Sequence, residues 1–297
     1  MTPARVTLIA SILAIGSGML WGFYWIPVRA LGQAGLGGAW GTFAITMAAC
    51  LLIFPFAARQ LHRINACPAL GIAATALGGV AFTLYSVAFL YGQVTITVLL
   101  FFLTPVWSTI IGRYIFGWPT PALRIWAIIV GLTGLAIMLS ADGTWPIPRN
   151  LGEWMGLLSG ILWSLASTGI RVKSNMAPAV AALIFATGAC SAACVLALWL
   201  GPAPQVTHIW TSLVIVIGTG GLWWAAAMIA LMWATLRLDP ARIGILLMSE
   251  VIVGAGSAAL LAGEYLSPLE MLGGGLVIGA GLLELWPVRA VPNAGRP

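Results

Sequence analysis

One carboxylate lies within an otherwise aliphatic stretch of this sequence. Glu250 occurs in LLMSEVIVG, residues 246–254, inside an apolar run from about residue 241 to about 262 that contains no other acid. An ionisable group in such a run is costly unless it is paired or solvated. Two interpretations follow: an acid that contacts a substrate ammonium group or carries a proton, or a protonated acid bonded to a neighbouring helix.

Aromatic side chains could supply the rest of a binding site. Tyr24 shares a helical face with Trp21, and the hydroxyl of Tyr85 lies in mid-segment, where it needs a partner. Aromatic walls stack on a substrate and attract an amino group through cation–π contact. We therefore expect these side chains to contact a substrate: Trp163, Glu250, Tyr85, Trp21, Tyr24 and Trp107.

Other site chemistries are not indicated. His62 and His208 fall in connections far from Glu250, and the four cysteines have no metal-ligand or disulfide-framework spacing. The sequence contains no H-E-x-x-H, G-x-S-x-G or P-loop motif. We expect no enzymatic activity, no cofactor and no metal, and keep an intramembrane enzyme or a channel as distant alternatives.

The composition places these residues in a membrane. Of the 297 residues, 61% are hydrophobic and 7% are charged, whereas soluble domains carry about 25% charged residues. A helix of about 20 apolar residues spans a bilayer. We predict an all-α integral membrane protein with ten transmembrane helices, at about 7–28, 38–57, 68–91, 94–116, 123–140, 152–170, 179–200, 209–235, 240–262 and 269–286.

The basic residues predict the orientation of these helices. Of the 13 Lys and Arg residues, only Arg29 and Arg149 fall on the face opposite the N-terminus. This bias follows the positive-inside rule and predicts that both termini are cytoplasmic. It also accounts for the net charge of +6, so we expect no nucleic-acid partner. Arg29 is expected to contact lipid headgroups at the outer face, with a gating role as the alternative.

One of the predicted helices begins with a complete set of capping residues. The segment SPLE places Ser267 before the helix, Pro268 at its first position and Glu270 at its third. This arrangement is typical of a capping box, in which the serine and the glutamate bond each other's backbone N–H groups. Glu270 is therefore expected to have a structural role.

The two halves of the sequence resemble each other. Trp21 aligns with Trp163, and Gly78-Gly79 with Gly220-Gly221, each 142 residues apart. FLTPV at 102–106 aligns with LMSEV at 247–251, 145 residues apart, which places Pro105 opposite Glu250. An interior proline disturbs the hydrogen bonds of a helix, and a carboxylate in an apolar span needs a partner. Each half therefore carries an unusual residue at the same depth in the membrane.

Because five is an odd number, two successive copies of a five-helix unit cross the membrane in opposite orientations. Inverted repeats of this kind are typical of secondary transporters, whose substrate sites lie near the midplane between the repeats. We predict two five-helix repeats, residues 1–145 and 146–297, around a central cavity.

The chain resembles the EamA type of the drug/metabolite transporter superfamily. The resemblance rests on LTPVWSTIIGRYIFG at 103–117 and on the hairpin GEYLS at 263–267, whereas the first half has GWPTP in place of the hairpin and lacks its acid. The resemblance implies ten helices around a cavity, export of small metabolites and an inner-membrane location. It assigns structural or hinge roles to Pro105, Gly263 and Glu264.

Within that family, the Trp content and Glu250 look most like the aromatic amino-acid exporters of the YddG kind. We therefore expect a secondary transporter that exports amino acids, aromatic and other neutral ones, by alternating access. A lipophilic-cation or drug exporter of the same superfamily is the alternative. The expected partners are a small-molecule substrate and the lipid bilayer, with no obligatory protein partner; coupling to an ion such as H⁺ is left open.

Overall fold

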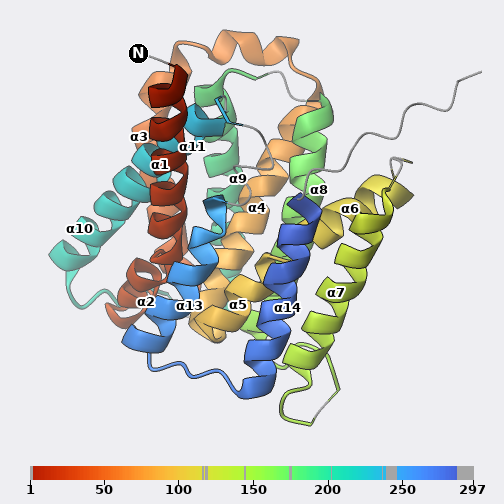
Figure 1. Cartoon of the computed structure of the whole chain (residues 1–297). Helices are drawn as coiled ribbons and strands as arrows, with labels where there is room; N and C mark the ends of the chain where they lie inside the picture. The colour runs from red at the N-terminus through yellow and green to blue at the C-terminus, as the bar shows by residue number, and fades with distance from the viewer. Residues whose placement is uncertain are drawn as a thin grey trace, which may run out of the picture.

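The structure is a computed structural model of the chain. It describes residues 3–115, 117, 120–143, 145–173, 176–201, 203–235, 237–238 and 246–285. These residues contain helices and connections and no strand. The long helices run up and down the molecule, and the N-terminus and the short helix η1 lie at the same end (Figure 1).

Residues 3–139 form helices whose ends lie within about two residues of the predicted spans, except in the first span, predicted at 7–28, where the helices extend farther at both ends. They are α1 (Pro3–Gly22), α2 (Trp25–Gln33), α3 (Trp40–Ala58), η1 (Leu61–Ala66), α4 (Ala69–Tyr91), α5 (Val94–Phe101), α6 (Thr104–Tyr114) and α7 (Ala122–Leu139).

The later residues contain a second series of helices. They are α8 (Leu151–Lys173), α9 (Pro178–Leu200), α10 (Ile209–Thr219), η2 (Gly220–Ala227), α11 (Met228–Thr235), α13 (Ser249–Leu261) and α14 (Pro268–Leu285). The start of the span predicted at 240–262 and the last residue of that predicted at 269–286 lie outside the described residues.

Seven helical segments in the described part of the chain are long and apolar enough to cross a membrane, and α13 and α14 are shorter apolar helices. The seven indicate a multi-pass membrane protein. The predicted count of ten stays a prediction. The seven segments are Ala4–Gln33, Trp40–Ala58, Ala69–Tyr91, Val94–Tyr114, Ala122–Leu139, Pro178–Leu200 and Ile209–Ala227.

Four spans that we predicted as continuous helices are interrupted, and in the span predicted at 240–262 the break is at Met248, just before α13. Pro105 ends the helical ladder, so α5 and α6 are separated at Phe102–Leu103. Pro27 does the same between α1 and α2, because its ring excludes the carbonyl four residues earlier, at Phe23. In the span predicted at 209–235, η2 is a π-helix; glycines at its start lower the cost of the altered path.

Close helix crossings depend on glycine. A Cβ atom on Gly22 of α1 would lie 2.9 Å from the Gly254 nitrogen of α13. One on Gly134 of α7 would lie 2.7 Å from the Gly273 carbonyl oxygen of α14, and these two helices run side by side in Figure 1. Small residues permit such approaches in membranes, where no hydrophobic force drives helices together.

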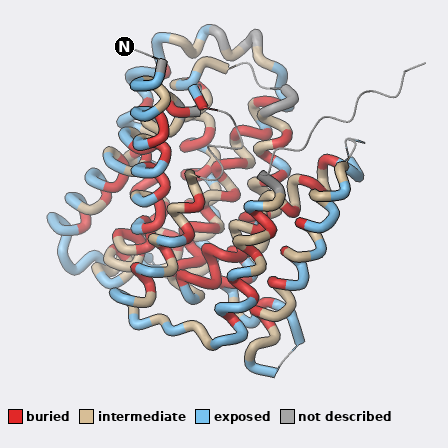
Figure 2. The backbone as a smooth tube through the Cα atoms, in the orientation of Figure 1, coloured by how far each residue is buried: buried red, intermediate tan, exposed pale blue. Residues whose placement is uncertain are grey.

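The core lies around α4 and α5. The span Ala69–Tyr91 is 67% buried, whereas Ala122–Leu139 is 28% buried, and Figure 2 shows buried residues gathered in the centre and exposed ones on the outer helices. Exposed side chains on outer helices include Trp199 and Leu260. Apolar side chains on this surface suit contact with lipid.

The connections alternate between the two ends of the bundle. Arg5 lies in the first turn of α1 and Arg59 follows α3, at the end that holds the N-terminus (Figure 1). Arg29 and Arg149 belong to the other end, near the turns that follow α2 and α7. These four residues lie at the ends of the bundle predicted for them, and the orientation of the termini stays a prediction; Arg242, Arg289 and Arg296 lie outside the described residues.

Candidate functional site

Glu250 lies at a helix break inside the bundle. Met248 precedes the first residue of α13, and Glu250 is the acid of its first turn. The first turn of a helix has unpaired N–H groups and a positive dipole end, which favour an acidic side chain there. Glu250 as a residue is of intermediate burial, and its position at the helix start places its carboxyl group within reach of α4.

Tyr85 of α4 is the hydrogen-bond partner of Glu250. Its Oη donates to Glu250 Oε1 at 3.0 Å, and Tyr85 itself is 3% exposed. Its ring packs on Phe89 and on Phe101 of α5, with centroids 4.7 Å and 4.5 Å away. The expectation that this mid-span hydroxyl has a partner is confirmed. The bond is compatible with both interpretations of Glu250.

A cluster of aromatic rings fills the space beside this pair, and Phe82 is its centre. The Phe82 ring lies 5.4 Å from Trp21, 5.3 Å from Tyr24 and 4.6 Å from Trp224, in edge-to-face contacts. Such contacts between buried rings stabilise beyond the area that they bury. Because Gly22, next to Trp21, packs on the Glu250 carbonyl, α1 joins the cluster to the acid.

Trp163 lies at the far side of the cluster. Its ring is 5.9 Å from Phe185 of α9, which lies 5.7 Å from Trp224. Trp21 thus contacts the Phe82–Trp224 pair directly, whereas Trp163 is joined to it through Phe185. Phe82 and Trp224 are themselves 142 residues apart. The rings follow the same separation as the sequence repeat.

Trp107 is not part of this cluster. It packs on Leu103, Val106 and Val277, between α6 and α14, and its buried indole N–H has no hydrogen-bond partner among the described residues. Five of the six expected contact residues therefore lie together in the structure, and Trp107 lies apart from them.

Several neighbours of the site were not predicted. Phe82 and Trp224 occupy equivalent positions in the two halves, so the repeat itself could have identified them. Trp223 donates its indole N–H to the Leu20 carbonyl at 2.6 Å, from within the π-helix η2. Nothing in the local sequence distinguishes Phe185 from other apolar residues of α9.

The prediction for Arg29 was wrong. Instead of extending to lipid headgroups, its Nη2 lies 2.8 Å from Glu264 Oε1, in an ion pair. Glu264 follows Gly263, whose φ of +65° requires the freedom of glycine. The turn predicted to act as a hinge is thus bonded to α2.

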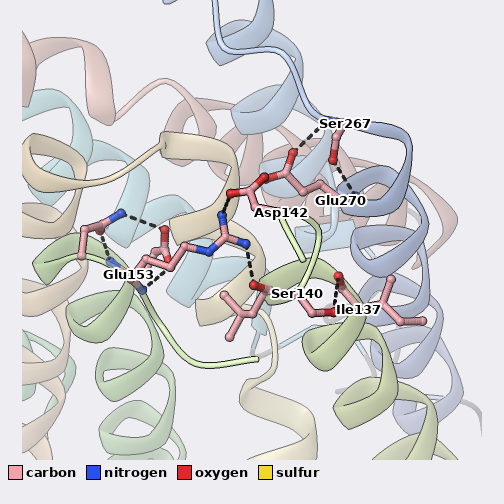
Figure 3. A network of polar contacts seen from close by, with 9 residues as sticks. Ile137, Ser140, Asp142, Glu153, Ser267 and Glu270 are labelled. Atoms are coloured by element: carbon pink, nitrogen blue, oxygen red, sulfur yellow. Dashed lines mark hydrogen bonds and ion pairs between the residues drawn. The ribbon is translucent and has the colours of Figure 1, made fainter. Parts of the chain in front are cut away.

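A second group of charged residues has a structural role (Figure 3). Ser267 and Glu270 form the predicted capping box, with the Ser267 N–H 2.7 Å from Glu270 Oε2. At the start of α8, Asn150 Oδ1 accepts the Glu153 N–H, and the Glu153 carboxylate accepts from the Asn150 side-chain amide and from the Arg149 backbone N–H. Arg149 pairs with Asp142 in the α7–α8 connection. These contacts hold the starts of α8 and α14 and the α7–α8 connection in place.

An apolar groove of about 660 Å³ lies between α4 and α9. None of the expected contact residues line it, and the aromatic rings fill the space between α1, α4 and η2. The predicted central chamber therefore stays a prediction. Within the described residues, no group of three or more His, Cys, Asp or Glu could hold a metal ion.

Comparison with known proteins gives a family for the first half. Residues 8–140 match the EamA-like transporter family. No curated protein matches the sequence. A solved crystal structure of a protein matches 95% of this chain and 96% of its own chain, with a TM-score of 0.61 and 14% identity. The protein is therefore a multi-pass membrane protein that shares the fold of that structure, and residues 8–140 carry the sequence pattern of EamA-like transporters.

Proposed function

We propose that the protein is a secondary transporter that exports small metabolites, with aromatic and other neutral amino acids as substrates, across the inner membrane by alternating access. The observation that carries this proposal is the Glu250–Tyr85 pair, at a helix break and beside a cluster of aromatic rings. Helix breaks with polar groups at membrane depth are typical of transporter binding sites.

The side chains have complementary roles in this proposal. The Glu250 carboxylate pairs with the substrate ammonium group, which competes with Tyr85 for Oε1. Tyr85 holds the carboxylate in place when no substrate is bound. Trp21 and Tyr24 offer ring faces to an aromatic or apolar side chain. The substrate meets one fixed charge, so it can be released.

The packing of the helices supports two inverted repeats, residues 1–145 and 146–297. Contacts of α4 with α8 and α9 are matched by contacts of the equivalent segments, α11 with α1 and η2 with α3. Contact of α6 with α8 is matched by contact of α13 with α1. Such a pattern is expected when two copies are related by a two-fold axis, and rocking of one copy against the other gives alternating access.

The charges support cytoplasmic termini. Arg5 and Arg59 lie at the end with the N-terminus, and Arg29 at the opposite end is neutralised by Glu264. Under the positive-inside rule, the N-terminal end faces the cytoplasm. The first proposed repeat then begins at the cytoplasmic face of the membrane, and the second begins at the opposite face.

Purified protein in proteoliposomes tests the function. Uptake of radiolabelled phenylalanine should be competed by neutral amino acids and not by quaternary amines. Glu250→Gln should reduce uptake by about tenfold or more, because a charge-assisted bond is lost. Asp142→Asn is the matched control, since that carboxylate is 62% exposed and outside the site.

Two results would contradict the proposal. Competition by quaternary amines alone would identify a lipophilic-cation exporter. Unchanged uptake and unchanged pH dependence in Glu250→Gln would leave Glu250 with a structural role only.

A further inference from the structure

Arg29 and Glu264 form a compact polar cluster at the end of the bundle opposite the N-terminus. Their side chains are 27% and 10% exposed and lie 2.8 Å apart. Arg29 also donates to the Phe89 carbonyl from Nε at 2.9 Å and to the Gly92 carbonyl from Nη2 at 3.1 Å. Each charge is thus mostly buried and has more than one partner.

The cluster matches the helix ends that meet there. Phe89 lies in the last turn of α4, whose carbonyl groups favour a cation, and Arg29 occupies that position. Glu264 Oε2 accepts the Thr95 N–H, in the first turn of α5, at 3.2 Å. Such a terminus favours an anion. The two charges therefore bracket the α4–α5 turn and also attract each other.

This pair joins the two halves of the chain. Arg29 belongs to α2, and Glu264 belongs to the α13–α14 turn, 235 residues later. The Trp25 indole N–H, one turn before Arg29, donates to Ser257 of α13 at 2.9 Å. Val28 and Leu31 of α2, which are 1% and 0% exposed, pack beneath this layer.

Both elements that carry the pair have freedom to move. The helical ladder is interrupted at Phe23–Tyr24, so α2 can tilt relative to α1. Gly263, with its positive φ, precedes Glu264. Polar bonds at a membrane face can exchange for bonds to water, whereas the apolar packing of helix centres cannot.

We propose that Arg29 and Glu264 form a latch, which closes this end of the bundle and opens once in each transport cycle. This inference rests on the proposed transport function for its role and on the contacts above for its geometry.

A labelling experiment tests the latch without a substrate. Val28→Cys is placed in a chain whose cysteines, Cys50, Cys67, Cys190 and Cys194, are replaced by Ala, and its reaction with a water-soluble maleimide is timed. Adding Glu264→Gln should raise the labelling rate by about tenfold or more, because a largely buried charge loses its partner. Asp142→Asn, which breaks the Arg149 pair within one connection, should leave the rate unchanged.

A locking experiment separates a moving latch from a fixed tie. Arg29→Cys with Glu264→Cys, in the same background, is bridged with a short bis-methanethiosulfonate reagent, since a direct disulfide is too short to replace the two long side chains, and is assayed in proteoliposomes. Uptake should fall at least tenfold on bridging and recover on reduction. Bridged protein that transports as fast as reduced protein would overturn the latch.

The two experiments also distinguish the two proposals. A Val28→Cys labelling rate that is equal with and without Glu264→Gln would overturn the latch whether or not transport is found. If the reduced protein transports no substrate of the panel while Glu264→Gln accelerates labelling, the proposed function fails and the latch stands as a gate of access.

Discussion

The helix breaks at Leu103 and Met248 have similar backbones but different side chains. Leu103 has φ −72° and ψ −1°, and Met248 has φ −59° and ψ −16°. A hydroxyl residue follows each: Thr104, whose carbonyl accepts a bond from Ser164 of α8, and Ser249, whose Oγ donates to the Ile15 carbonyl of α1. Each break is therefore tied to the first helix of the other half.

The two helix breaks differ at the residue that follows the hydroxyl residue. Pro105 follows Thr104, and Glu250 follows Ser249. Proline explains the first break sterically, but the second break occurs without it. The acid is compatible with a helix start because the first turn favours negative charge. The break therefore belongs to the architecture of both halves, whereas the carboxylate is present in only one.

Converting the second break into a copy of the first should have the largest effect. Glu250→Pro introduces a residue that the first turn of a helix tolerates, and it removes the carboxylate. The protein should therefore fold, and uptake should fall by about 100-fold. Uptake in proteoliposomes and thermal unfolding measure the two quantities. Pro105→Ala, the matched change at the first break, should leave uptake within about threefold. Equal losses in both variants would show that the breaks are functionally alike.

Equivalent glycines in the two halves have different surroundings. A Cβ on Gly79 of α4 would overlap the Phe185 carbonyl of α9 and lie 2.5 Å from the Ala189 nitrogen, whereas one on Gly221 would meet nothing within 4 Å. Gly79→Ala should therefore destabilise the protein by about 2 kcal/mol through overpacking. Gly221→Ala should change stability by less than about 0.5 kcal/mol. Thermal unfolding of both variants in detergent is the measurement, and equal midpoints would contradict the packing described here.

Helix ends were predicted well where the signal is local. The span predicted at 68–91 is α4 at Ala69–Tyr91, and that at 123–140 is α7 at Ala122–Leu139. In both cases a proline precedes the helix. The break at Phe23–Tyr24 and the π-helix η2 were missed, because hydropathy is averaged over a span and hides a change within a single turn.

The candidate site was predicted residue by residue but not as pairs. Glu250 and Tyr85 each stood out as a polar group in an apolar span, yet their bond joins residues 165 positions apart and depends on how α4 packs near α13. Arg29 was misassigned for the same reason, since Glu264 is 235 positions away. A polar residue shows that it needs a partner; only the packing shows which one.

The Tyr85–Glu250 bond has no counterpart in the other half, where the equivalent residues are Ala227 and Pro105. Tyr85→Phe removes one hydrogen bond to the acid and keeps the ring against Phe101. Uptake should fall by about tenfold, which corresponds to about 1.4 kcal/mol. Tyr265→Phe is the control, because that side chain is 83% exposed. Wild-type uptake in Tyr85→Phe would remove the tyrosine from the site.

The smallest expected effect is a loss of stability at Trp223, a residue of the π-helix η2 whose counterpart in α4 has no side-chain donor. Trp223 donates its indole N–H to the Leu20 carbonyl at 2.6 Å, while its equivalent, Ala81, is a fully buried residue that offers no side-chain donor. Trp223→Phe should cost about 1 kcal/mol, since the Leu20 carbonyl still accepts the Phe23 N–H. Thermal unfolding measures this loss. If the midpoint does not change, the indole bond contributes nothing to the π-helix, and the close packing of η2 on α3 alone must hold it.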